Sequence, residues 1–170
     1  MAEKTFRVTL EGLIHGWGSP SVDNVRNTAA IPEKRGIVGL LACCMGLKRG
    51  DPRIRNIFDS VKVDVIIDEN YADRYELLHD YQTVNGLPVS LGSNELTRFP
   101  TAKGDTKACG IIRHKYYITD AVYYAYITAE ENLAEELYKA VEDPEWIPYF
   151  GRKCCLPSEP LAPTWIQQTH

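Results

Sequence analysis

Alternating hydrophobic and polar residues mark the first strand of this chain. In residues 4–11 the apolar side chains of Phe6, Val8 and Leu10 are separated by polar ones, so an extended segment would have one apolar face. Strand character is expected again at residues 61–67, 75–83, 112–118 and 121–128. A turn is expected at Thr119-Asp120, between the last two of these segments.

Two helices are expected between the first two strands. Residues 33–47 are a run of small and apolar residues that follows the basic sequence PEKRG. Asp51 followed by Pro52 is typical of an N-cap and a first helical turn, and predicts a short helix that ends near Ser60.

A third helix is expected after the last strand. Apolar residues recur every fourth position from Leu133 to Val141, and Pro144 closes the pattern. Thr128 and Glu131 have the spacing of a capping box at the start of this helix.

Two segments lack sustained periodicity. Residues 84–111 are rich in Gly, Ser, Thr, Asn and Lys, and so long a loop in a compact domain usually serves a function. We interpret them as a protruding β-hairpin, or thumb. Residues 144–170 form a proline-rich C-terminal segment.

The order of elements predicts an α+β fold, a single modified RRM-like or ferredoxin-like domain over residues 1–170.

Composition narrows the function classes. The chain has 170 residues, of which 44% are hydrophobic and 25% charged, as in soluble globular domains. It has no apolar run of membrane-spanning length and no signal-peptide pattern, and its five cysteines suggest reduced thiols, so a cytoplasmic protein is expected. No phosphate-binding GxxxxGK[ST], GxGxxG or HExxH motif is present, and we expect no metal and no cofactor.

Charge is segregated along the chain, although the formal net charge is −4. Residues 23–55 hold seven basic and three acidic residues, and residues 98–115 hold five basic and one acidic. Residues 59–80 and 130–145 are strongly acidic. Such segregation is typical of a protein with one nucleic-acid face and other solvated or protein-facing surfaces.

Two segments from opposite ends of the chain suit phosphate binding. Residues 12–20 form a glycine-rich loop, and a basic helix start follows it; glycine allows close approach of a ligand, and a helix start offers unpaired N–H groups. Residues 148–161 (PYFGRKCCLPSEPL) present two adjacent cations on a turn stiffened by prolines. The cations of these two regions are Arg26, Lys34, Arg35, Arg152 and Lys153. We expect them to converge into a cradle for RNA.

Two aromatic residues allow alternative interpretations. Trp17 lies in the glycine-rich loop and would either stack on a base or plug the edge of the sheet. Tyr81 would be either a core or strand-surface aromatic residue or a stacking platform.

The chain resembles the Cas-five (CasD) family of type I CRISPR systems, and most closely its I-E branch. The resemblance lies in the blocks HGWGSP, IPEKRGIVGLLACCMGLKRGD, DYQTVNG, RHKYYITDAVYYAYI and PYFGRKCCLPSEPL, which keep the family's order over nearly the whole chain. It implies an RRM-like domain with a β-hairpin thumb and a non-catalytic subunit that caps the 5′ handle of CRISPR RNA in the antiviral Cascade complex. Family members usually continue further beyond the GRKCC block than this chain does.

The resemblance also implies partners and RNA contacts. The partners would be CRISPR RNA, the Cas-seven backbone subunits and the large subunit that reads the protospacer-adjacent motif, with target DNA contacted only indirectly. By the matching blocks, the RNA contacts would be Trp17, Arg26, Arg35, Tyr81, Arg113, Arg152 and Lys153.

Two other functions remain open. Members of the type I-C branch process precursor CRISPR RNA, and a metal-independent endoribonuclease needs a base, an acid and a cation. His114, Lys115 and Tyr116 supply these types, although Lys115 would point away from the other two on a strand, and His15 is a further candidate. The third possibility is a ferredoxin-like interaction module without an RNA role.

Overall fold

The computed structural model describes residues 2–84, 99–100, 106–107 and 111–167. The described helices are α1 (Lys34–Cys44), α2 (Pro52–Ser60) and α3 (Glu131–Glu142). The described strands are β1 (Glu3–Glu11), β2 (Ile14–His15), β3 (Val25–Arg26), β4 (Lys62–Ile67), β5 (Glu76–Val84), β6 (Phe99–Pro100), β7 (Thr106–Lys107), β8 (Ile111–Thr119), β9 (Val122–Glu130) and β10 (Thr164–Trp165).

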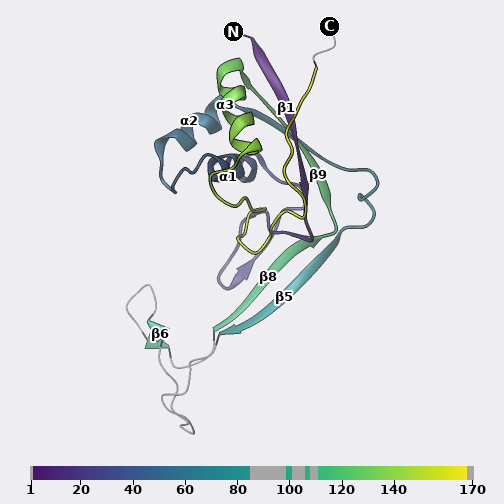
Figure 1. Cartoon of the computed structure of the whole chain (residues 1–170). Helices are drawn as coiled ribbons and strands as arrows, with labels where there is room; N and C mark the ends of the chain where they lie inside the picture. Colours follow the sequence, from purple (N-terminus) through teal and green to yellow (C-terminus); the bar gives the residue numbers. More distant parts are fainter. Residues whose placement is uncertain (1, 85–98, 101–105, 108–110, 168–170) are drawn as a thin grey trace.

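The body of the molecule is built on a four-stranded sheet with the order β10-β1-β9-β4, in which all neighbours are antiparallel. β1 and β9 pair over nine residues each, from Glu3 opposite Glu130 to Glu11 opposite Val122. The helices lie on one side of this sheet (Figure 1). The apolar residues that alternate along β1 therefore face the helices and are buried, as a strand with one covered face requires.

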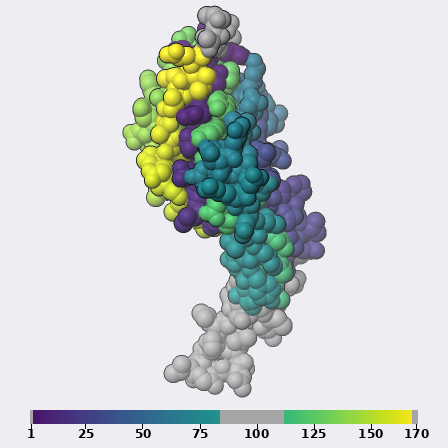
Figure 2. Space-filling view, turned by 90° about the vertical axis from the view of Figure 1, so that its right-hand side faces the viewer, coloured from purple at the N-terminus to yellow at the C-terminus, as the bar shows by residue number. Residues whose placement is uncertain are grey.

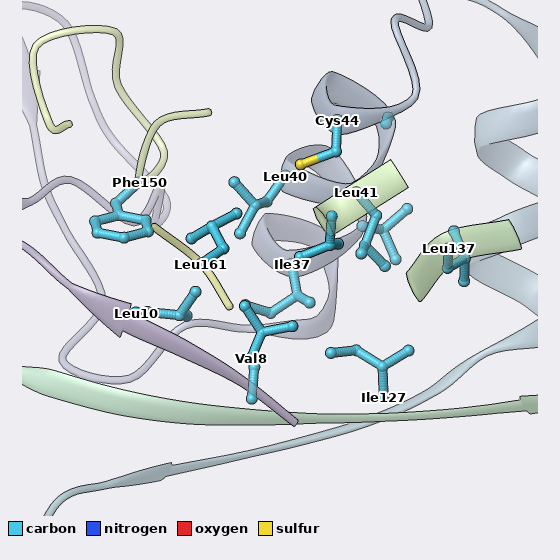
Figure 3. Close-up of a cluster of buried hydrophobic side chains, with 14 of the residues drawn as sticks. Val8, Leu10, Ile37, Leu40, Leu41, Cys44, Ile127, Leu137, Phe150 and Leu161 are labelled. Atoms are coloured by element: carbon cyan, nitrogen blue, oxygen red, sulfur yellow. The ribbon is translucent and has the colours of Figure 1, made fainter. Parts of the chain in front are cut away.

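The core lies between that sheet and two helices (Figure 3). α1 directs Ile37, Leu40 and Leu41 toward it, and α3 contributes Ala134, Leu137 and Val141. The expected stripe of α3 is thus confirmed at its second and third positions, whereas Leu133 is only partly buried.

A second sheet forms an arm that extends from the body. β5 and β8 pair antiparallel over nine residues, and both β2 and β3 pair with β8, whose other edge they occupy. The arm projects away from the helices and the body (Figures 1 and 2). Leu77 and Leu78, which are neighbours on β5 and face opposite sides, are 60% and 43% exposed. Neither face of the arm is therefore covered at this strand.

Most predicted elements are confirmed, and so is the α+β class. The five strands and three helices occur within a few residues of the expected positions. Asp51 caps α2, because its carboxylate accepts a hydrogen bond of 2.9 Å from the backbone N–H of Arg53. Asp120 adopts a φ of 52° in the predicted turn between β8 and β9.

The predicted capping box is wrong. β9 continues to Glu130, so Thr128 lies inside a strand, and its hydroxyl shares a hydrogen bond of 2.8 Å with that of Thr5 on β1. The N-cap of α3 is Glu130, which makes no side-chain capping bond. Pairing with β1 therefore extends the strand past the position where the local pattern begins the helix.

The two irregular segments are only partly described. Within residues 84–111, β6 and β7 form a short antiparallel pair, the two end residues belong to β5 and β8, and residues 85–98, 101–105 and 108–110 of the predicted thumb lie outside the described residues. In the proline-rich segment, β10 pairs with β1 at Phe6 and Arg7, a strand that the pattern did not predict. No helix in the described part of the chain is long and apolar enough to cross a membrane.

Candidate nucleic-acid interface

The glycine-rich loop and the loop at residues 149–153 pack backbone against backbone. The N–H of Gly16 donates a hydrogen bond of 3.0 Å to the carbonyl of Phe150. Gly151 adopts a φ of +79°, and a Cβ there would collide with the carbonyl of Gly16. These two glycines allow the close approach, so the two segments do meet; the convergence of their cations into a cradle for RNA stays a prediction.

His15 and Trp17 form the buried floor of this junction. Trp17 is 1% exposed and packs with His15 and Phe150 at ring-centroid distances of 6.0 and 5.7 Å. Such burial does not present its indole to a base, so the structure agrees with the interpretation of Trp17 as a plug and not with base stacking. Gly36 of α1 lies against the same indole ring.

His15 is fully buried, and Nε2 lies 2.9 Å from the carbonyl oxygen of Ala121. Burial lowers the pKa of its imidazole from 6.5 to about 4, against the opposing effect of backbone hydrogen bonds. The rings of Trp17, Tyr123 and Phe150 surround it. A base enclosed in this way cannot reach an RNA hydroxyl, which contradicts its candidacy as a catalytic residue.

A hollow of about 420 Å³ lies over Trp17, between α1 and the 149–153 loop. Arg35, Arg49 and Gly151 line it, and Arg35 and Arg49 are both exposed. Among the ion pairs of the described residues, neither arginine has a carboxylate partner. Glu33 also lines the hollow and opposes an anion there, but the two guanidinium groups outweigh its charge.

The amino end of α1 borders this hollow and has the charge pattern of an anion site. Its N-cap, Glu33, makes no side-chain capping bond, and the first turn holds no acidic residue. Instead Lys34 and Arg35 stand there, although cations at a helix amino end destabilise the helix by roughly 0.3–1 kcal/mol. An anion between this end and Arg35 would offset that cost. Lys34 does not join Arg35, because its Nζ lies 4.7 Å from the ring centroid of Phe58 on α2.

Arg152 is engaged by the protein itself. Nη1 donates to the carbonyl of Tyr116 (3.0 Å), and Nη2 donates to the carbonyls of Arg26 and Asn27 (both 2.9 Å). The guanidinium also lies 4.6 Å from the ring centroid of Tyr117. The expectation of a free cation for RNA is therefore corrected: Arg152 binds β3 and the residue after it to β8.

A row of cations continues along one face of the arm. Arg26 on β3 pairs with Lys115 on β8, and Arg113 lies two residues further along β8, so the three side chains share a face. Tyr117, under the guanidinium of Arg152, shares this face too. Arg26 is exposed, and its Nη1 donates to the carbonyl of Asp23 at 3.1 Å.

The opposite face of the arm is aromatic. Nε2 of His79 lies 2.9 Å from Nδ1 of His114, and the ring of His79 also stacks on Tyr116 at 4.7 Å. Tyr81 is 57% exposed and packs edge-on against His114. Tyr81 is thus a strand-surface aromatic residue on the face opposite Arg113. The register confirms that Lys115 points away from His114 and Tyr116.

Lys153 does not line the hollow over Trp17. It is exposed and lines a second hollow, which shares Gly39, Arg49 and Tyr149 with the first. The sequence interpretation missed Arg49 as a member of the site and His79 as the neighbour of His114. A Lys-Arg pair at residues 48–49 signalled the charge of Arg49, but its position beside Arg35 depends on the turn after α1.

Residues 5–169 match the family described as CRISPR-associated protein (Cas_Cas5). The chain belongs to this family. It is 31% identical over 160 residues to the CRISPR system Cascade subunit CasD of Escherichia coli (strain K12), covering 89% of this chain and 66% of that protein. The resemblance inferred from the sequence blocks is therefore confirmed.

Two solved structures are similar to this member of the family. One belongs to a CRISPR RNA-guided surveillance complex, with a TM-score of 0.74, 29% identity, and coverage of 92% of this chain and 61% of that one. The other is described as a Cas protein, with a TM-score of 0.56, 25% identity, and coverage of 92% and 60%. The chain thus spans less than two thirds of the length of these relatives.

Proposed function

We propose that this protein is a non-catalytic RNA-binding subunit of a Cascade-type CRISPR surveillance complex, in which it caps the 5′ handle of the CRISPR RNA. The observation that carries the proposal is the hollow over Trp17, where Arg35 and Arg49 lie beside the amino end of α1 and have no carboxylate partner within the described part of the chain. The similarity to a Cascade subunit and to a chain of an RNA-guided complex supplies the biological setting.

The fold supports the proposal in its topology. The sequence of elements β1-α1-β4-β9-α3-β10 and the strand order β10-β1-β9-β4 fit the ferredoxin-like arrangement of an RRM, with α2 and the arm as additions. The predicted thumb, residues 84–111, would follow from the end of the arm. The row of Arg26, Lys115 and Arg113 leads from the Arg152 junction toward it.

Each part of the site has a distinct proposed role. Arg35 and Arg49 bind phosphate by charge-assisted hydrogen bonds, while the N–H groups of the first turn of α1 orient it. Arg152 positions the arm against the glycine-rich loop, and the cations of the arm hold the following backbone. Lys153 and Tyr81 lie outside the hollow and would contact a strand only where it leaves the cradle. The neighbouring subunits would be the Cas-seven backbone proteins and the large subunit.

The test is titration of a labelled 5′-handle RNA with the purified protein at several salt concentrations. Removal of one phosphate contact by Arg35→Ala should weaken binding by about 10-fold and reduce the slope of log affinity against log salt by about 0.7. The matched control is Arg55→Ala, because Arg55 is exposed on α2 and pairs with Asp59. Equal effects of the two changes, or equal affinity for a scrambled RNA, would contradict the proposal.

The same titration also tests the alternative that the protein is an endoribonuclease. His79 and His114 form a hydrogen-bonded pair beside Tyr116, so an acid and a base are present on one face of the arm. Among the paired residues of β5, β8 and β3, however, this face holds no lysine or arginine to stabilise a phosphorane. We expect the RNA to stay full length in EDTA; cleavage that His114→Ala abolishes would establish the endoribonuclease instead.

A further inference from the structure

An apolar ridge stands on the surface next to the proposed RNA site. It consists of Trp146, Ile147 and Leu156, which are 40%, 77% and 51% exposed. The three residues border a hollow of about 610 Å³. Leu47, which follows α1, and Ile54 of α2 also line this hollow. Exposed apolar groups gathered around a hollow are more typical of an interaction surface than of solvated protein.

The segment that bears the ridge is fixed to the body. The N–H of Glu145 donates to the carbonyl of Cys44 at 2.8 Å, and Sγ of Cys43 donates to the carbonyl of Ile147 at 3.5 Å. On the other side, Cys155 is fully buried and its carbonyl accepts from the N–H of Phe150 at 2.7 Å. Because the backbone is held, little backbone conformational entropy is lost when these side chains become covered.

The chemistry of the hollow indicates what covers it. Its apolar lining is mainly aliphatic, which accommodates aliphatic or aromatic side chains of a protein but offers a nucleobase few hydrogen-bond partners. Lys153 lies at its border and has no carboxylate partner among the ion pairs of the described residues, and Arg49, which the proposed RNA site uses, lies at the boundary between the two hollows. The occupant should therefore bring acidic groups beside its apolar ones.

We propose that the ridge of Trp146, Ile147 and Leu156 is the docking site of another protein subunit, one that inserts a segment of apolar side chains flanked by carboxylates. The hollow shares Gly39, Arg49 and Tyr149 with the hollow proposed for RNA, so this subunit would lie next to the bound handle. The inference rests on the proposed function, because it assumes a complex whose other subunits are proteins.

The first experiment introduces a photocrosslinking amino acid at position 147 of this chain. The chain is co-expressed with CRISPR RNA and the other subunits of the complex. The control places the same group at position 13, since Leu13 is 75% exposed in the glycine-rich region but outside the ridge. We expect position 147 to form an adduct with one protein subunit, at a peptide with carboxylates beside apolar residues. An adduct with RNA or with a second copy of this chain, or none in an intact complex, would overturn the proposal.

The second experiment uses Ile147→Asp with Leu156→Asp, which place carboxylates on the ridge without touching the core. We expect retention of the crosslinked subunit to fall by at least about 10-fold, as for loss of a central apolar anchor. Leu13→Asp should leave it unchanged. Affinity of the isolated chain for handle RNA should stay within about twofold, so loss of RNA binding in the unaltered protein would count against the proposed function and not against the ridge. Full retention of the subunit by the ridge variant would refute the docking site.

Discussion

The ladders β1–β9 and β5–β8 each join nine residue pairs, but they differ in what covers them. In β9 every second side chain, from Tyr123 to Ala129, is at most 1% exposed beneath the helices. In β5, by contrast, Leu77, Leu78 and Tyr81 are between 43% and 60% exposed. The backbone pairing is the same, so the difference shows that the body derives its stability from burial, whereas side chains on both faces of β5 stay exposed.

The largest expected effect compares two isoleucines in strands of equal length. Ile127→Ala in β9 should lower the free energy of unfolding by about 2–5 kcal/mol, because Ile127 is fully buried. Ile112→Ala in β8 should cost about 1 kcal/mol or less, because Ile112 is 42% exposed. Urea denaturation of both variants measures the contrast. Similar losses of unfolding free energy in the two variants would mean that side chains of the arm contribute as much to stability as side chains of the body.

The next largest effect concerns the junction between body and arm. Gly151→Ala should cost roughly 3 kcal/mol, because Gly151 has a φ of +79° and its new Cβ would meet the carbonyl of Gly16. Gly50→Ala is the matched control: φ is +91° there, but nothing lies within 4 Å, so only backbone strain of about 1 kcal/mol is expected. Equal losses in thermal or urea unfolding would show that the close packing of the two loops contributes nothing.

The smallest of these effects is a pH dependence that arises from His15. Its pKa is lowered to about 4 by burial, so the unfolded chain takes up a proton below pH 6.5 while the folded protein stays neutral. Stability is therefore full above pH 6.5 and falls as the pH drops toward 4, by about 2 kcal/mol at pH 5. Urea unfolding at pH 7 and pH 5 tests this.

The control for this pH dependence is the exposed His79 of the arm. His15→Gln should remove most of the decline between pH 7 and pH 5, whereas His79→Gln should retain it, because His79 is not enclosed in the core. An unchanged decline in His15→Gln would assign the effect to other groups.

Sequence patterns predicted the elements that span long periodic runs. β1, β4 and β9 alternate over six to nine residues, and the cap of α2 depends only on the local geometry of Asp51. The two-residue strands β2, β3 and β10 carry no such signal, since their pairing is decided by where β8 and β1 lie. The predicted start of α3 was wrong for the same reason, because pairing with β1 extends β9 to Glu130.

The contact between the two glycine-containing segments was predictable from the sequence, but the contacts of the individual arginines were not. The two glycine-containing segments do meet, because Gly16 and Gly151 permit the contact. Whether an arginine is free, however, depends on the carbonyl groups within its reach. Arg152 donates hydrogen bonds to three of them and ties the arm to the body, whereas no such bond from Arg35 occurs among the residues that the structure describes. No local pattern around the two residues distinguishes these outcomes.

The position of β1 between β9 and β10 has a consequence for synthesis. Phe6 pairs with Ile127 on one side and with Trp165 on the other, so β1 acquires its neighbours only after residues 122–130 and 164–165 have been synthesised. Pairings so distant in sequence slow folding, because a long loop must close before they form. Until then, the apolar side of β1 is not covered by the body, and the four-stranded sheet is incomplete.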